Sequence, residues 1–195
     1  MPMNITTSRK ELTDLVKAWV AISVAFSIVM HGLRFDPSFL VAFAVSAIVV
    51  GAGFLFHELA HKFIAQRFRC WAEFRSDDKM LLLAIVFSFM GFIFAAPGAV
   101  LIRGHIDRRQ SGLISAAGPF SNMVVAIAFL AMFFTSNPLY QLIGSYGFRI
   151  NAWLAVFNLI PVGVFDGAKI WEWNKVIYFA LVALGIFLMV LQFNI

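Results

Sequence analysis

One short stretch of this chain has the residue types and spacing of a metal-dependent hydrolase: His57-Glu58-Leu59-Ala60-His61. On a helix the two histidines lie one turn apart, about 6 Å along the axis, so both imidazoles can reach one metal ion. Glu58 projects from the neighbouring face, where its carboxylate can contact a water molecule on the metal. Two neutral histidine ligands with a carboxylate as general base are typical of catalytic zinc sites.

The motif lies inside a long apolar run, from Phe39 to Ala65. An ionisable side chain in the middle of a bilayer costs on the order of 2.5–3.5 kcal/mol, and such residues are mostly functional. The alternative is a core helix that happens to carry polar residues, and this cost disfavours it. We therefore interpret His57 and His61 as metal ligands and Glu58 as the general base.

The composition indicates a membrane protein. Of the 195 residues, 62% are hydrophobic and 13% are charged, and the apolar runs are long enough to cross a bilayer. The net charge of +5 does not indicate a nucleic-acid partner, because Lys and Arg flank the apolar runs. Among ten acidic residues we expect only Glu58 and Asp166 to lie deep in apolar surroundings. Cys70 is alone, which excludes an intrachain disulfide.

We expect an all-α polytopic membrane protein with about five to six transmembrane helices in one domain, residues 1–195. The expected segments are peripheral spans at about 15–33 and 176–193, core spans at about 39–66, 112–135 and 149–172, and an external loop at about 135–149. Of fifteen Lys and Arg residues, only Arg34 and Arg149 fall on the external side of this arrangement. The asymmetry predicts a multi-pass protein of the cell membrane with a cytoplasmic N-terminus.

The apolar run from Met80 to Ile102 has two interpretations. Its length is that of a transmembrane helix, but basic residues flank both ends, so both ends should face the cytoplasm. A helix over Met80 to Phe94 would rise about 22 Å, and an extended return over Gly98 to Arg103 would cover about 20 Å. We therefore predict a re-entrant helix and strand at about 80–103, before the third core helix, and retain a full crossing as the alternative.

Asp166 is the candidate for a third metal ligand. It follows a stretch in which Pro161, Gly163 and Gly167 should break the helix. His57 lies ten residues before Arg67, about 15 Å on a helix, and Asp166 lies nine before Lys175, about 14 Å. Since both spans run inward, the acid and the histidines should lie at the same depth. The set would bind one Zn²⁺ per chain and keep an open fourth position.

Three motifs together resemble those of the site-2 proteases, which are intramembrane zinc metalloproteases. They lie at 57–61, at 117–122 (Ala-Gly-Pro-Phe-Ser-Asn) and at 158–167, which begins with Asn158 and ends with Asp166-Gly167. They follow the family's order and cover the chain from about residue 39 to 172. The chain resembles a minimal form, without a PDZ or CBS domain.

The resemblance implies roles for individual residues. His57, His61 and Asp166 would be the zinc ligands, Glu58 the general base, and Asn158 the residue that steadies the substrate near the metal. Residues that would support the site are Asn122, Pro161 and Gly167. For Asn158 and Asn122, the alternative role is a hydrogen bond between helices.

The resemblance also implies a strand before the Gly-Pro motif, which would hold an unwound substrate by β-addition. Its residues are Gly98, Ala99, Val100, Leu101 and Ile102. The expected reaction is hydrolysis of a peptide bond in the transmembrane segment of single-span membrane proteins within the bilayer, near the cytoplasmic side. The alternative is a zinc transporter or a non-proteolytic metal-binding membrane protein, which would not need Glu58 at that position. The oligomeric state stays open.

Overall fold

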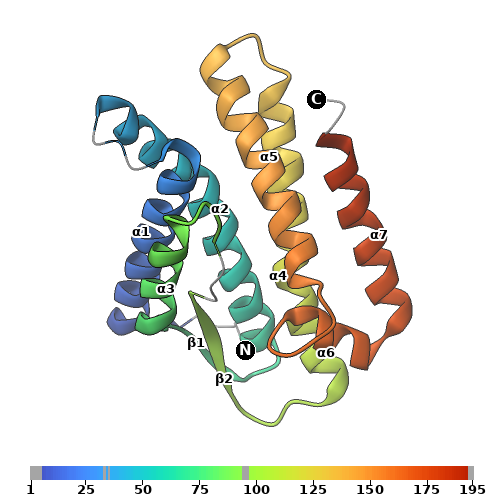
Figure 1. The fold of residues 1–195 in the computed structure, drawn as a ribbon. Coiled ribbons are helices and arrows are strands. Elements are labelled where there is room, and N and C mark those ends of the chain that lie inside the picture. The colour runs from blue at the N-terminus through green and yellow to red at the C-terminus, as the bar shows by residue number, and fades with distance from the viewer. Residues whose placement is uncertain (1–5, 33, 35, 94–96, 193–195) are drawn as a thin grey trace.

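The computed structural model describes residues 6–32, 34, 36–93 and 97–192, and within them it contains seven helices and one two-stranded sheet (Figure 1). The expected element ends at Leu33, Phe94 and Phe193 lie outside the described residues. The elements in chain order are α1 (Arg9–His31), α2 (Pro37–Arg67), β1 (Trp71–Ser76), α3 (Asp78–Ser88), β2 (Gly98–Arg103), α4 (Arg108–Phe133), α5 (Pro138–Asn158), α6 (Asp166–Trp173) and α7 (Lys175–Leu191).

The long helices run side by side, and the sheet and α6 lie together at one end of the molecule (Figure 1). α2 packs between α1 and α4, α5 packs along α4, and α3 packs against α1. The centre of the core lies where α2, α4 and α5 meet, at the fully buried Val49, Met123 and Ala152. Helices that pack this closely can carry side chains from distant parts of the chain to one point.

Polar side chains fix the starts of the apolar helices. Asp36 accepts hydrogen bonds from the backbone N–H groups of Ser38 and Phe39, and Pro37 occupies the first turn of α2. Asp107 and Gln110 form a reciprocal capping box at the start of α4. These caps satisfy N–H groups that a helix cannot pair within itself.

Three of the described helices are long and apolar enough to cross a membrane: α1, α2 and α4. α7 is apolar but has only 17 residues. The finding is consistent with a membrane protein. The expected total of five to six spans, and their orientation, stay predictions.

The segment that we expected to be an external loop, 135–149, is largely helical. α5 begins at Pro138, with Asn137 as its cap. Gly144 and Gly147 suggested turns, but both lie against α4. A Cβ on Gly144 would lie 2.5 Å from the backbone nitrogen of Phe133, and one on Gly147 would lie 2.2 Å from the ring of Phe129. These glycines allow two helices to approach closely, so the loop prediction was wrong.

The expected strand at Gly98–Arg103 is present as β2, but its partner β1 was not predicted. The two strands are antiparallel, with Ser76 opposite Gly98 and Trp71 opposite Arg103. The chain therefore leaves the sheet after Ser76 and returns to the same place at Gly98. The helix in this excursion, α3, ends at Ser88, earlier than expected. Whether it enters a membrane stays a prediction.

Three further buried acids, Glu11, Asp14 and Glu73, were also missed. Glu11 is 0% exposed and forms an ion pair with Lys62, whose Nζ lies 2.6 Å from Glu11 Oε2. We had expected only Glu58 and Asp166 to be deeply buried. The expected span began at about residue 15, but α1 begins at Arg9, and Glu11 in its first turn contacts α2 and β1.

Candidate metal centre

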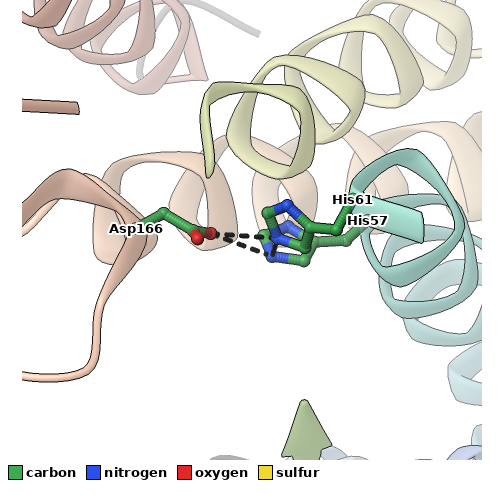
Figure 2. A group of neighbouring side chains, drawn as sticks. All are labelled: His57, His61 and Asp166. Atoms are coloured by element: carbon green, nitrogen blue, oxygen red, sulfur yellow. Dashed lines mark hydrogen bonds and ion pairs between the residues drawn. The ribbon is translucent and has the colours of Figure 1, made fainter. Parts of the chain in front are cut away.

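Two histidines of α2 and the first residue of α6 bring three potential metal ligands together (Figure 2). The Nε2 atoms of His57 and His61 lie 3.0 Å apart. Asp166 Oδ2 lies 3.3 Å from His57 Nε2 and 3.2 Å from His61 Nε2. The structure thus brings together the three residues that the sequence suggested as ligands.

The other nitrogen of each imidazole has a fixed partner. His61 Nδ1 lies 2.7 Å from the carbonyl oxygen of Ile114, which can only accept a hydrogen bond, so Nδ1 carries the proton. His57 Nδ1 lies 2.6 Å from Asn122 Oδ1, and the amide nitrogen of Asn122 donates to the carbonyl of Gly53. In the neutral rings, both Nε2 atoms then present lone pairs to Asp166.

The donor set fits a zinc ion. Three electron-rich atoms at this separation repel one another unless a proton or a metal cation lies between them. Ligands about 2.0–2.1 Å from zinc in a tetrahedral site lie roughly 3.3–3.4 Å from one another, close to the 3.0–3.3 Å found here. Two imidazole nitrogens and one carboxylate oxygen are also a set that catalytic zinc uses. The cluster can therefore hold a metal ion.

Gly118 lets α4 approach the two imidazoles. A Cβ at this position would lie 2.4 Å from His61 Nε2 and 2.6 Å from His57 Cε1, far inside contact distance. Any side chain here would displace the ligand atoms themselves. From the sequence, Gly118 was one of several small residues, and only the packing shows that it borders the metal centre.

Asp166 reaches the histidines because the chain breaks between α5 and α6. α5 ends at Asn158, and residues 159–165, which include Pro161, form a turn. Gly167 then packs against the end of α5, where a Cβ would lie 2.1 Å from the carbonyl oxygen of Leu159. Pro161 and Gly167 therefore lie where they can set the position of Asp166 by ending one helix and allowing the next to start beside it.

A chain of amides supports His57 from behind. Besides Gly53, Asn122 donates to Asn151 Oδ1 at 3.2 Å, and Asn151 donates to the carbonyls of Gly147 and Val49. Both asparagines are buried, at 1% and 0% exposure. The interhelical hydrogen bond that we considered for Asn122 exists, and it belongs to the same network as the bond to His57. Asn151 was not predicted, because a lone asparagine in an apolar helix gives no motif.

A cavity of about 590 Å³ opens beside the ligands. Its walls include Glu58 and Asn158 from the predicted site and Lys169 from α6. Four residues of the strand also line it, namely Gly98, Ala99, Val100 and Ile102, whereas the Leu101 side chain is 48% exposed and is not part of the wall. The general-base candidate, the ligands and the strand therefore face one space.

Asn158 has a local partner in this structure. Its amide nitrogen donates to the carbonyl of Leu154 at 2.9 Å, one turn earlier on α5. The helix-to-helix hydrogen bond that we considered for this residue is not among the bonds of the described residues. Lys169, three positions after Asp166, was not singled out from the sequence and supplies the only Lys or Arg side chain among the described residues of the wall.

Comparison with known proteins gives one match. No protein-family model matches the chain, and no solved structure matches it. A Methanocaldococcus jannaschii protein with the name "putative zinc metalloprotease" is 38% identical over 176 residues, which are 88% of this chain and 88% of that protein. Because the similarity extends over nearly all of both chains, this chain belongs to the same family as that archaeal protein.

Proposed function

We propose that this protein is an intramembrane zinc metalloprotease of the site-2 type. Its reaction would be hydrolysis of a peptide bond in the transmembrane segment of a single-span membrane protein, near the cytoplasmic side. One observation carries the proposal: the helix that presents His57, Glu58 and His61 is itself long and apolar enough to cross a membrane. A metalloprotease site on such a helix acts inside the bilayer.

The chain's own residues divide the chemistry. His57, His61 and Asp166 would hold one zinc ion, which when bound lowers the pKa of water and polarises a carbonyl. Glu58 lies one residue after the first ligand and lines the cavity. Its carboxylate can take the proton of the attacking water and return it to the leaving amine. A transporter or storage protein has no use for a base in this position.

Strand β2 can hold the substrate in an extended form. The Phe74 N–H bonds to Glu11 and so points away from β2. In an antiparallel pair, opposite residues share this orientation, and it alternates along the strand. The backbone groups of Gly98, Val100 and Ile102 therefore point to the outer edge of β2. A peptide that pairs with this edge would lie beside the cavity that contains Glu58.

Asn158 could orient the same peptide. It lines the cavity, and the bond to Leu154 leaves its amide oxygen without a hydrogen-bond partner among the described residues. A small rotation of the side chain would also free its amide nitrogen. It would then bind the substrate backbone between the strand and the metal.

The flanking charges support a cytoplasmic position of the site. α2 ends at Arg67, about 15 Å along the helix from His57, and α6 is followed by Lys175. Positive residues collect on the cytoplasmic side of membrane proteins. Water and the cleaved product would then enter and leave from that side, in a multi-pass protein of the cell membrane.

The test is cleavage of a panel of single-span substrates by the purified protein in detergent. We expect cleavage within the transmembrane segment that a chelator stops and that added zinc restores. The matched control is Glu58→Gln, which keeps all three ligands. Wild-type protein that binds zinc but cleaves no substrate of the panel, or a Glu58→Gln variant that cleaves normally, would contradict the proposal and favour a transport or binding role.

A further inference from the structure

The carboxylate of Glu11 joins three elements. Its Oε2 lies 2.6 Å from Lys62 Nζ on α2, and its Oε1 accepts a hydrogen bond of 3.0 Å from the Phe74 N–H on β1. Lys62 is 2% exposed and donates a second bond to Thr7. A fully buried acid on α1 is therefore the common contact of the sheet and of the helix that carries the metal ligands.

Side chains occupy the outer edge of β1. The Phe74 N–H belongs to Glu11, and the Phe74 carbonyl accepts from Arg75 Nη1 at 2.8 Å. The carbonyl of Ala72 accepts from Gln66 Nε2 of α2 at 3.2 Å. These groups all point away from β2, so a peptide cannot pair with β1 without breaking them. Residues of β2, in contrast, line the cavity.

Lys62 connects the Glu11 contact to the helix segment that carries the candidate metal ligands. It follows His61 in the sequence, so the Glu11 carboxylate holds α2 within one residue of a ligand and holds β1 at Phe74. Phe74 packs edge-to-face on Phe54 of α2, with ring centroids 5.4 Å apart. The Phe54–Phe74 contact thus fixes the sheet against α2, and Phe54 also lines the cavity.

We propose that Glu11 is a positioning residue of the protease, which fixes the sheet relative to the metal-binding helix and closes the β1 edge, so that an extended substrate pairs only with β2. The inference rests on the proposed function. Glu11 does not touch the substrate; it acts through Phe74 and Lys62.

The experiment compares two double variants in the full-length zinc protein. Glu11→Gln with Lys62→Met removes both charges but keeps a side-chain oxygen for the Phe74 N–H. Glu11→Leu with Lys62→Met removes both charges and that acceptor. Removing both partners avoids the unpaired buried charge that a single change would leave. The pair therefore differs mainly in one hydrogen bond to the sheet.

We expect the Leu/Met variant to raise KM at least tenfold over the Gln/Met variant for a substrate that the wild type cleaves. Zinc content should stay near one per chain in both, and kcat should change less than KM. Equal KM values in two variants with equal zinc content would overturn the positioning role. If the wild type itself cleaves nothing, the proposed function fails instead.

Hydrogen exchange tests the same contact without any substrate. The Phe74 amide should exchange slowly in the wild type and in the Gln/Met variant, and at least tenfold faster in the Leu/Met variant. If the Leu/Met variant does not fold, the wild-type and Gln/Met measurements remain. A Phe74 amide that exchanges as fast as an exposed loop amide in either of them would refute the proposal.

Discussion

Helix α2 buries ionisable side chains on two sides, and the two sets are satisfied in opposite ways. Lys62 meets the opposite charge of Glu11 at 2.6 Å. His57 and His61 instead face each other and Asp166 with electron-rich atoms 3.0–3.3 Å apart, while their N–H groups are committed to Asn122 and Ile114. Both sets are buried, so burial alone does not distinguish a structural group from a functional one.

The difference lies in what each set still needs. The Glu11–Lys62 pair is electrically complete within the protein, and its further hydrogen bonds tie elements together. The two imidazoles and the Asp166 carboxylate instead form a cluster that could hold a metal ion. The comparison predicts that substitutions in the His57, His61 and Asp166 cluster change the zinc content and the reaction. Substitutions of Glu11 or Lys62 should instead change the stability or the position of the sheet, with zinc retained.

The largest expected effect separates holding the metal from using it. Glu58→Gln should lower the cleavage rate by about 10²–10⁴-fold, because a general base contributes that much. It should keep about one zinc per chain, since Glu58 is not a ligand. His57→Ala and Asp166→Ala should lose both zinc and cleavage. Zinc content measured by atomic absorption, beside the cleavage rate, checks this, and zinc loss in Glu58→Gln would make Glu58 a ligand.

The next effect concerns the ion pair of Glu11 and Lys62. Lys62→Met alone leaves Glu11 charged and buried without its partner, and we expect a loss of about 3–5 kcal/mol in the free energy of unfolding. The double change of Glu11→Gln with Lys62→Met should recover most of it. Denaturant titration in detergent measures both values. A single variant as stable as the double one would show that the ion pair is not the self-contained unit that the comparison assumes.

A smaller effect is expected behind His57. Asn122→Leu removes the acceptor of the His57 Nδ1–H, and loss of such a partner typically lowers metal affinity about 10–100-fold. Asn151→Leu is the matched control, because Asn122 would keep its bonds to His57 and Gly53. The zinc affinity of Asn151→Leu should fall less than that of Asn122→Leu. Competition with a chelating dye measures both, and equal losses would mean that packing, not the bond to His57, sets the affinity.

An effect of similar size tests the substrate role of Asn158. Loss of a hydrogen bond to the reacting substrate costs about 1–3 kcal/mol, roughly ten- to a hundredfold in rate. Asn158→Ala should therefore cleave at least tenfold more slowly, with zinc content and thermal midpoint near those of the wild type. Its bond in the structure is to its own helix, at Leu154. A variant with normal turnover per folded molecule would leave Asn158 with that local role only.

Much of the site could be predicted because its pattern is local. The spacing of His57 and His61 places both on one helix face, and the break before Asp166 follows from Pro161 and Gly167. The strand at Gly98 to Arg103 followed from a matched length of chain between basic flanks, and the structure has that strand. The long apolar runs of the chain likewise indicated the membrane helices.

Other features depend on partners that are distant in the chain. Gly144 and Gly147 signal a turn by type, but the facing helix α4 makes them packing residues. Asn151 gains its place through hydrogen bonds with Asn122, 29 residues away, and with the carbonyl of the more distant Val49, and β1 exists only through its pairing with β2.

The amino-acid sequence by itself determined the His-Glu-x-x-His motif, the candidate third ligand and the apolar helices, because helix periodicity and helix breaks are properties of neighbouring residues. Only the tertiary structure decided that Glu11 is buried against Lys62, 51 residues away, and that its carboxylate occupies the outer edge of β1. A buried charge is stable only beside its partner, and long-range packing chooses that partner.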